Sequence, residues 1–169
     1  IVETEAYRGP DDKASHTYNN KRTSRTEIQF NPGGFAYIYF IYGMYYCFNV
    51  TANEACKPEA VLIRALLPLE GLGLMKARRK TQDVINLCNG PGKLCSALDI
   101  NMNSYGEDLC GDKLYILDDN IKPEVKTSPR INIDYAEEYI NVPWRYFASD
   151  NIYNIYVSKG HKKTRKIKE

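Results

Sequence analysis

The stretch FAYIYFIYGMYYCFNV, residues 35–50, decides the fold that we expect for this chain. It contains two runs rich in aromatic and β-branched residues, joined by Gly43 and Met44. A two-residue connection with glycine first favours a type II′ turn, whose twist matches that of the flanking strands. The stretch therefore predicts a β-hairpin with Tyr42 and Tyr45 flanking its tip. Because a hairpin tip usually faces solvent, these rings suit a wedge between stacked bases better than a core.

A strand is expected over residues 1–7, where apolar and polar residues alternate. In an extended chain Glu3, Glu5 and Tyr7 share one face. Two interpretations of this face stay open. It is either the solvent-facing side of an edge strand or a place where a carboxylate stands beside a flat ligand.

A second strand is expected over residues 60–67, which are mostly apolar around Arg64. A buried arginine is rare unless it is paired. Arg64 therefore either reaches solvent from an edge position or points at a carboxylate or phosphate, and the residues alone do not choose between the two.

The rest of the chain predicts shorter elements around a long polar loop at residues 8–25, which contains His16. Long loops in compact domains are often functional, although a single loop histidine is also a common surface residue. The other expected elements are helices at 26–30 and 69–80, a helix that follows the turn at 89–94 and ends at about residue 98, and strands at 114–117, 130–133, 144–147 and 152–157. Together they predict one α+β domain over residues 1–158: a curved, mainly antiparallel sheet, roll-like or barrel-like, with flanking helices and a protruding hairpin.

Composition narrows the class of protein. Hydrophobic residues make up 43% and charged residues 26% of the 169 residues, as in ordinary globular proteins. No apolar run approaches the ~18 residues of a membrane span, and no signal-peptide pattern opens the chain. The five cysteines and two histidines lack metal-ligand spacing, so we expect no metal. The odd number of cysteines favours reduced thiols in an intracellular protein. The expected compartment is the cytoplasm of a prokaryote or the nucleus of a eukaryote. Because the chain starts at Ile1 within an expected strand, we also expect a preceding segment to be missing.

Charge is unevenly distributed. Residues 76–93 carry five basic side chains against Asp83, and the tail at 159–169 carries six against Glu169, whereas residues 99–138 are mainly acidic. Such a chain can present a basic face to a polyanion, although charge runs are more often solvated surface. The turn at 89–94 precedes a helix and contains Lys93, so it is either a phosphate-binding element or an ordinary turn.

Five segments together resemble the alkyladenine (3-methyladenine, methylpurine) DNA glycosylase family. They are VETEAY, YIYFIYGMYYCFNV, VLIRALLPLEG, NGPGKLC and the late PWRYF with YVS, in that order between residue 1 and about residue 158. The resemblance implies an enzyme that flips a damaged purine nucleotide out of double-stranded DNA and hydrolyses its N-glycosidic bond. It implies no cofactor and no membrane, and we expect a monomer.

The resemblance also implies roles for individual residues. Glu5 matches the general base that activates water, and Arg64 matches an arginine near that water and the flipped nucleotide's phosphate. The base-binding residues implied are Tyr7, Ala14, His16, Tyr39 and Asn49. Asn49 matches a side chain that rejects the exocyclic amine of guanine. The DNA contacts implied are the wedge Tyr42 with Met44 and Tyr45, and Thr23, Arg25, Gly90 and Lys93.

The expected hairpin conflicts with these roles at one point. A turn at Gly43 and Met44 pairs Tyr39 with Phe48, which directs Tyr39 and Asn49 to opposite faces. A bulge, a bend or a differently placed turn is needed to bring both into one pocket.

Two other functions stay open beside the glycosylase. A non-catalytic binder of distorted nucleic acid would use the same aromatic hairpin but would not need Glu5. A helix-hairpin-helix repair enzyme built on GPGKL is disfavoured, because the chain is rich in strands and lacks a clear lysine nucleophile with a matching downstream aspartate.

Overall fold

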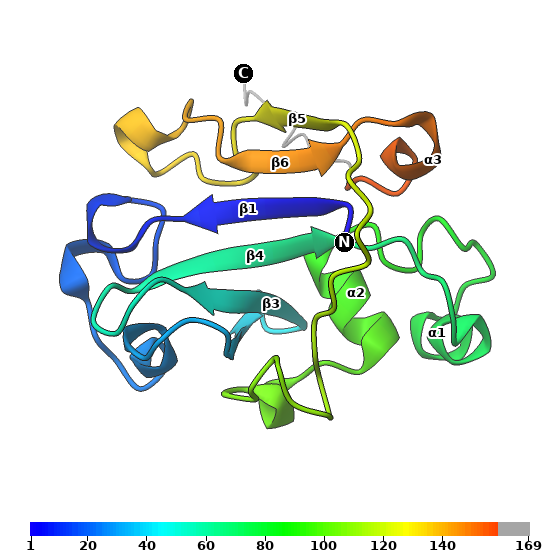
Figure 1. Cartoon of the computed structure of the whole chain (residues 1–169), viewed down its shortest axis with the longest axis horizontal. Coiled ribbons are helices and arrows are strands. Elements are labelled where there is room, and N and C mark those ends of the chain that lie inside the picture. Colours follow the sequence, from blue (N-terminus) through cyan, green and yellow to red (C-terminus); the bar gives the residue numbers. More distant parts are fainter. Residues whose placement is uncertain (159–169) are drawn as a thin grey trace, which may run out of the picture.

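A computed structural model of the chain describes residues 1–158, so the basic tail at 159–169 lies outside the described residues. Six strands form one open sheet in the order β2-β3-β4-β1-β6-β5, and every neighbouring pair is antiparallel (Figure 1). The strands are β1 (Glu3–Tyr7), β2 (Ala36–Ile41), β3 (Tyr45–Ala52), β4 (Glu59–Ala65), β5 (Val125–Ser128) and β6 (Arg145–Ala148). The α+β fold with a mainly antiparallel sheet is confirmed.

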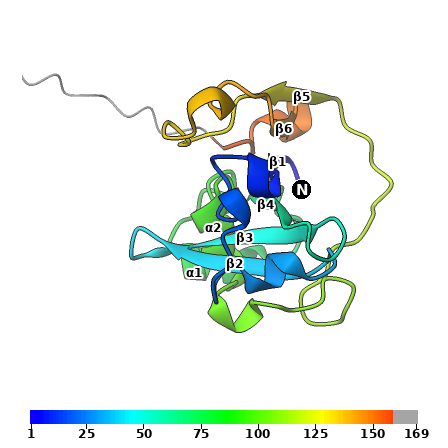
Figure 2. The same cartoon turned by 90° about the vertical axis from the view of Figure 1, so that its left-hand side faces the viewer.

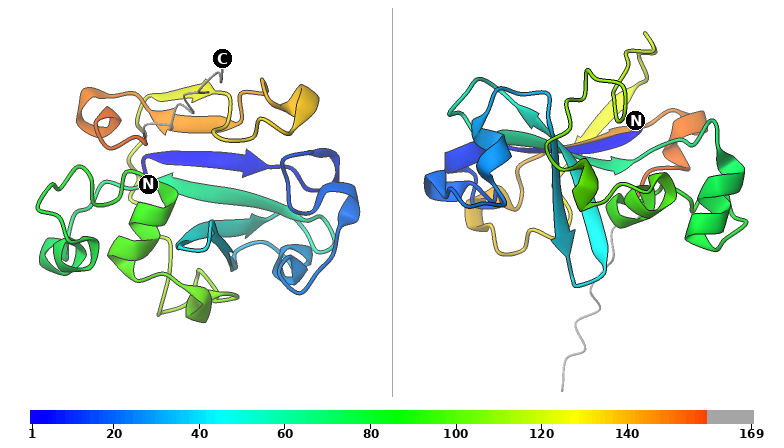
Figure 3. Two further views of the ribbon diagram at one scale, coloured as in Figure 1. Left: turned by 180° about the vertical axis from the view of Figure 1, so that it is seen from behind. Right: turned by 90° about the horizontal axis from the view of Figure 1, so that it is seen from below.

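Three α-helices and five short 3-10 turns complete the described chain. The helices are α1 (Leu72–Arg79), α2 (Pro91–Leu98) and α3 (Asn151–Asn154). The 3-10 turns are η1 (Gly9–Asp11), η2 (Tyr18–Asn20), η3 (Glu27–Phe30), η4 (Met102–Ser104) and η5 (Glu137–Tyr139). Helix α2 packs against β3 and β4, and α1 packs against α2, as the view from behind in Figure 3 shows. No helix of the described part is long and apolar enough to cross a membrane.

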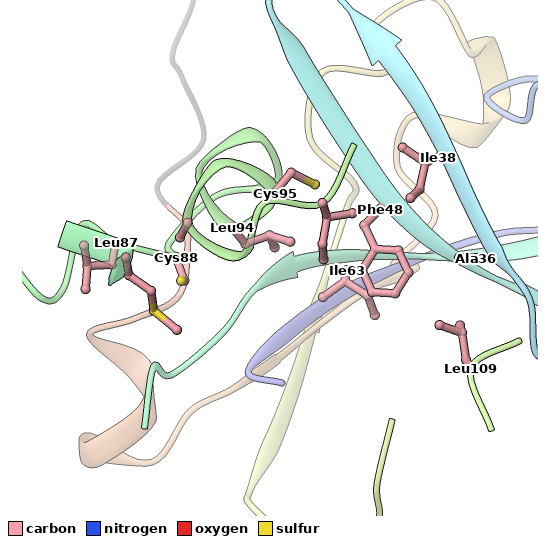
Figure 4. Packing of buried hydrophobic residues seen from close by; sticks show 12 residues of the cluster. Ala36, Ile38, Phe48, Ile63, Leu87, Cys88, Leu94, Cys95 and Leu109 are labelled. Carbon is pink, nitrogen blue, oxygen red and sulfur yellow. The ribbon is translucent and has the colours of Figure 1, made fainter. Parts of the chain in front are cut away.

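The two faces of the sheet have different chemistry. Ile38, Phe48 and Ile63 point to one face and pack with Leu94 and Cys95 of α2 in the main core (Figure 4). Burial of each such aliphatic or aromatic side chain stabilises the fold by about 1.5–3 kcal/mol. Because successive strand residues point to opposite faces, the polar and aromatic neighbours of these residues are directed to the other face.

Loops cover this second face. Ala14 from the loop after β1 packs with Ile133 and Ala136 from the segment before β6, and Tyr7 lies against the same cluster. The long polar loop that the sequence predicts therefore folds back over the sheet, and the space between loop and sheet contains the candidate site.

The β2–β3 hairpin protrudes from the body of the molecule, as Figure 2 shows. Its turn differs from the predicted one. Ile41 pairs with Tyr45, so the turn has three residues, and the N–H of Met44 donates to the carbonyl of Ile41 at 3.3 Å. Tyr42 and Gly43 both have positive φ, 55° and 69°, as in a type I′ turn. The predicted type II′ turn at Gly43 and Met44 is wrong because Tyr42 itself adopts the left-handed conformation.

The three-residue turn shifts the register of the hairpin by one residue. Tyr39 pairs with Cys47 and Tyr37 pairs with Asn49. Side chains directly opposite one another share a face, so Tyr37, Tyr39 and Asn49 all point to the polar face. The expected conflict between Tyr39 and Asn49 is removed by the position of the turn.

Two predicted strands, at 114–117 and 130–133, are absent from the described chain. Residues 114–117 belong to an exposed connector, in which Leu117 is 76% exposed. At 130–133 the N–H of Ile131 donates to the Glu5 carboxylate and is not available for a strand ladder. The strand that forms in this region is β5, at Val125–Ser128.

The predicted strand at 152–157 is also wrong, because helix α3 and a turn occupy this segment. The N–H of Asn154 donates to the carbonyl of Asp150 at 2.9 Å, a local helical hydrogen bond. Tyr153 and Tyr156, three residues apart, pack on the same small cluster beside β1. This spacing fits one face of a helix better than one face of a strand.

Candidate active site

A row of paired residues crosses five strands on the polar face of the sheet. Tyr37 pairs with Asn49, Asn49 with Leu62, Leu62 with Glu5, and Glu5 with Arg145. Directly paired residues point to the same face. The register therefore brings an aromatic ring, an amide and a carboxylate from distant parts of the sequence into one line.

A cavity of about 770 Å³ lies against this face. The predicted site residues that line it are Tyr7, Ala14, His16, Tyr39, Tyr42, Tyr45, Asn49, Arg64, Gly90 and Lys93. Predicted residues that are not among its lining residues are Glu5, Met44, Thr23 and Arg25. Glu5 is completely buried beside the lining residues Tyr7 and Arg64. The cavity thus joins the predicted base-binding residues to the hairpin tip and the start of α2.

Glu5 is held by two hydrogen-bond donors and one ion pair. The hydroxyl of Tyr7 donates to Oε2 at 2.9 Å, and Nη1 of Arg64 lies 3.2 Å from the same oxygen. The N–H of Ile131 donates to Oε1 at 2.7 Å. Burial and the Glu5 charge together raise the pKa of Tyr7 well above its ordinary value, which keeps its hydroxyl a donor.

Arg64 reaches Glu5 through a β-bulge. Glu3 pairs with Ala65 while Thr4 pairs with Ile63, so Arg64 is the extra residue of β4. Bulges next to active sites commonly redirect a side chain. Nε of Arg64 donates to Glu3 at 2.8 Å, and the residue is only 6% exposed. Of the two interpretations of Arg64, the structure shows the one in which it points at carboxylates.

Glu3 is the centre of a second buried network. Its Oε1 accepts from Nε of Arg145 at 2.7 Å and from the hydroxyl of Ser158 at 2.7 Å, and its Oε2 accepts from the Ser158 N–H. Burial raises the pKa of Glu3, but the Arg64 charge and the hydrogen bonds from Ser158 and Arg145 outweigh it, so the pKa is lowered. Two carboxylates and two guanidiniums thus balance in charge beneath the cavity.

Three rings form an aromatic wall. The His16 ring meets Tyr39 edge-on with centroids 4.7 Å apart, and Tyr37 lies 5.5 Å from Tyr39. The Tyr37 hydroxyl is 2.7 Å from Nδ1 of His16. Burial, with smaller contributions from Arg25 and Lys21, lowers the pKa of His16 to about 4. His16 is therefore an uncharged ring at neutral pH, suited to stacking.

The lowered pKa predicts that His16 makes the protein sensitive to acid. The unfolded state binds a proton on this histidine near its ordinary pKa, and the folded state does so only near pH 4. Stability is therefore lost as the pH falls from about 6.5 to about 4. We expect the parent to lose up to about 3 kcal/mol more than His16→Asn in the free energy of unfolding over this range. Urea titrations of both proteins at several pH values measure it, and parallel pH dependences would contradict the assignment.

The hairpin tip is exposed and rests on α2. Tyr42 is 72%, Met44 63% and Tyr45 46% exposed. A Cβ added to Gly92 would lie 3.0 Å from the Tyr45 ring, so glycine permits this close contact at the first turn of α2. Lys93, in the first turn of α2, lines the cavity. Its Nζ donates to the side-chain oxygens of Asn86 at 3.0 Å and Asn89 at 2.7 Å.

Thr23 and Arg25 are exposed in the loop before η3. With Met44 they lie outside the cavity lining, and a role for them in DNA contact stays a prediction. Ala14 lines the cavity, but its N–H donates to Oδ1 of Asp12 at 2.9 Å.

Several residues of the site were not predicted from the sequence. Tyr37 lies two residues from Tyr39 on the same strand face, and this spacing was the available signal. Gln29 is 1% exposed, lines the cavity, and its Nε2 has no hydrogen-bond partner in the part of the chain that is described. Asp12 and Arg130 form a buried ion pair behind Tyr7 that no sequence pattern indicated.

The described residues contain no group of three His, Cys, Asp or Glu side chains placed to hold a metal ion. All five cysteines, which lie within this part, are free.

Comparison with known proteins places this geometry in context. The family model described as "Methylpurine-DNA glycosylase (MPG)" matches residues 1–152. A protein of Desulfitobacterium hafniense (strain Y51) is 48% identical over 162 residues, which cover 90% of this chain and 80% of that protein. A protein of Bacillus cytotoxicus is 52% identical over 167 residues, 89% of this chain and 80% of that protein. Both carry the assigned name 3-methyladenine DNA glycosylase.

Proposed function

This chain belongs to the methylpurine-DNA glycosylase family, and we propose that it hydrolyses the N-glycosidic bond of flipped, damaged purine nucleotides with a water that Glu5 activates. As a member of that family it is a DNA glycosylase, a hydrolase that acts on DNA in repair. The damaged bases that we propose are 3-methyladenine, 7-methylguanine, hypoxanthine and ethenoadenine. The observation that carries the mechanism is the buried Glu5 carboxylate, held by Tyr7 and Arg64 beside the cavity.

The chemistry of the reaction fits these groups. As the purine departs, positive charge develops on the sugar, and a nearby carboxylate stabilises that charge. The same carboxylate can accept a proton from the attacking water. Tyr7 and Arg64 both face Oε2. Among the described residues Oε1 accepts from the Ile131 N–H alone, so it retains lone-pair capacity for the water.

The walls of the cavity support a preference for alkylated purines. The uncharged rings of His16, Tyr37 and Tyr39 offer π faces and edges to a base. Alkylation at a purine ring nitrogen leaves the base cationic in the nucleotide, and a cation is attracted to π faces. Asn49 is 2% exposed and its Nδ2 donates to the Tyr37 carbonyl at 3.0 Å. We propose that this fixed amide clashes with the exocyclic amine of guanine and so excludes normal DNA.

We also propose that the enzyme acts as a monomer. The alternative of a non-catalytic binder is not retained, because the family consists of glycosylases and because a buried carboxylate serves no purpose in stacking alone.

Base release from alkylated duplex DNA tests the function. We expect the purified protein to liberate free 3-methyladenine or 7-methylguanine and to leave abasic sites, at the same rate with and without a chelator. Binding to the alkylated duplex without release of any base would overturn the proposal.

The hairpin tip supports Tyr42 as the wedge that replaces the flipped nucleotide in the stack. We expect Tyr42→Ser to weaken binding to duplex DNA with an abasic site by about 1–3 kcal/mol, the value of one stacking contact. Fluorescence anisotropy measures the affinity. Tyr115→Ser is the matched control, since Tyr115 is also exposed, 52%, but is not among the cavity-lining residues. Equal affinities of Tyr42→Ser and the parent would remove Tyr42 from this role.

A further inference from the structure

A buried ion pair joins the two loop segments that cover the site. Nη1 and Nη2 of Arg130 donate to the two carboxylate oxygens of Asp12 at 2.5 and 2.8 Å. Neither side chain is exposed to solvent. Because the desolvation of two charges offsets most of their attraction, a buried pair is weak evidence for a role in stability alone. Its contacts indicate a different role.

The guanidinium of Arg130 lies against the ring of Tyr7. It is 4.7 Å from the centroid of that ring and 5.0 Å from the centroid of the Trp144 ring. Tyr7 lines the cavity and Arg130 does not, so Arg130 covers the side of the ring turned away from the cavity. Nη1 of Arg130 also donates to the carbonyl of Ala6 at 2.9 Å, which fixes the backbone just before Tyr7.

The same pair is connected to Glu5. Ile131, which follows Arg130, donates its N–H to Oε1 of Glu5 at 2.7 Å. The placement of this amide depends on where the Arg130 side chain is anchored. One ion pair thus holds both the ring that faces the cavity and a donor that orients the carboxylate.

We propose that the Asp12–Arg130 pair is a positioning element for Tyr7 and Glu5. This inference rests on the proposed function, in which Tyr7 stacks on the flipped base and Glu5 activates the water. A misplacement of about 1 Å at a reacting group can cost about 10²-fold in rate. The pair therefore acts on the rate of base release, without contact to the DNA backbone.

The double variant Asp12→Asn/Arg130→Met tests the proposal. Asn retains an acceptor for the Ala14 N–H, Met retains apolar contact with Tyr7 and Trp144, and no unpaired charge is left buried. We expect single-turnover base release to slow by about 10- to 100-fold. Affinity for duplex DNA with an abasic site should stay close to that of the parent.

Lys13→Gln is the matched control. Lys13 forms exposed ion pairs with Glu137 at 2.6 Å and Glu138 at 2.8 Å, so it links the same two segments without contact to Tyr7 or Glu5. We expect it to release base at the parent's rate. Trp144, the only tryptophan, lies beside Arg130, and its emission shows whether each variant keeps the native surroundings of the pair.

Arg130→Lys is a second, conservative variant that keeps a charge opposite Asp12 but lacks the planar guanidinium over Tyr7. We expect a folded protein with an intermediate rate, which provides a test even where the double variant does not fold. Parent-like rates in both folded variants would overturn the positioning role and leave the proposed function intact. An equal loss in Lys13→Gln, or a loss of DNA affinity as large as the loss of rate, would show a general structural role instead. A parent that releases no base would overturn the proposed function, and the positioning role with it.

Discussion

Glu5→Gln is expected to slow base release from alkylated duplex DNA by about 10²- to 10⁴-fold, the range usually contributed by general acid–base catalysis. Gln is nearly the same size as Glu, and its single amide oxygen can still accept from either Tyr7 or the Ile131 N–H, which in the parent donate to different carboxylate oxygens. It carries no charge to stabilise the departing sugar and cannot take the proton of the water. Single-turnover release of 7-methylguanine measures the effect.

The same variant should retain its affinity for damaged duplex DNA, because Glu5 is buried and the proposed DNA contacts lie elsewhere. Glu59→Gln is the matched control. Glu59 also lies on a strand, β4, but it is not among the cavity-lining residues and its carboxylate faces Arg8 at 3.8 Å. We expect Glu59→Gln to release base at the parent's rate. Release by Glu5→Gln at that rate would show that another group activates the water.

The hairpin shows how far the sequence predicts this fold. Its aromatic and β-branched runs are sufficient to place two antiparallel strands, because strand propensity and periodicity are local properties. The register of the two strands cannot be predicted in this way, because it depends on whether Tyr42 belongs to the strand or to the turn. A shift of one residue exchanges the faces of a strand. Only the structure shows Tyr42 with a φ of 55° and therefore Tyr39 and Asn49 on one face.

Long-range pairs are the part of the site that the sequence could not supply. Glu5 and Tyr7 were predicted together because they lie two residues apart on one strand. Arg130 is 118 residues from Asp12, and no local pattern connects the two. The apolar neighbours of Arg130 instead suggested a strand, and this prediction failed because the Ile131 N–H is used by Glu5.

The charge cluster beneath the cavity leads to the largest expected effect on stability. Arg64→Met removes the cation shared by Glu3 and Glu5, leaving two completely buried carboxylates with Arg145 as the remaining guanidinium on Glu3. Removing one partner of a buried pair typically costs 3–5 kcal/mol, because the other charge is left uncompensated. We expect a decrease of about 3–5 kcal/mol in the free energy of unfolding at pH 7, measured by urea titration. Arg22→Met is the surface control, since Arg22 and Glu27 are both about half exposed and an exposed ion pair contributes little to stability.

The pH dependence separates this electrostatic effect from a loss of packing. In the parent, the pKa of Glu3 is lowered, so the stability that this group contributes is present above its unfolded pKa of about 4.3 and is lost as the pH falls. In Arg64→Met the charge that most lowers the pKa of Glu3 is gone, so burial raises this pKa relative to that in the parent. Glu3 can then take up a proton at a higher pH, and this protonation relieves part of the destabilisation. The difference in unfolding free energy between parent and Arg64→Met should therefore shrink as the pH falls from 7 toward 4. A difference that stays constant over this range would mean that Arg64 stabilises the protein through its packed side chain and not through the two carboxylates.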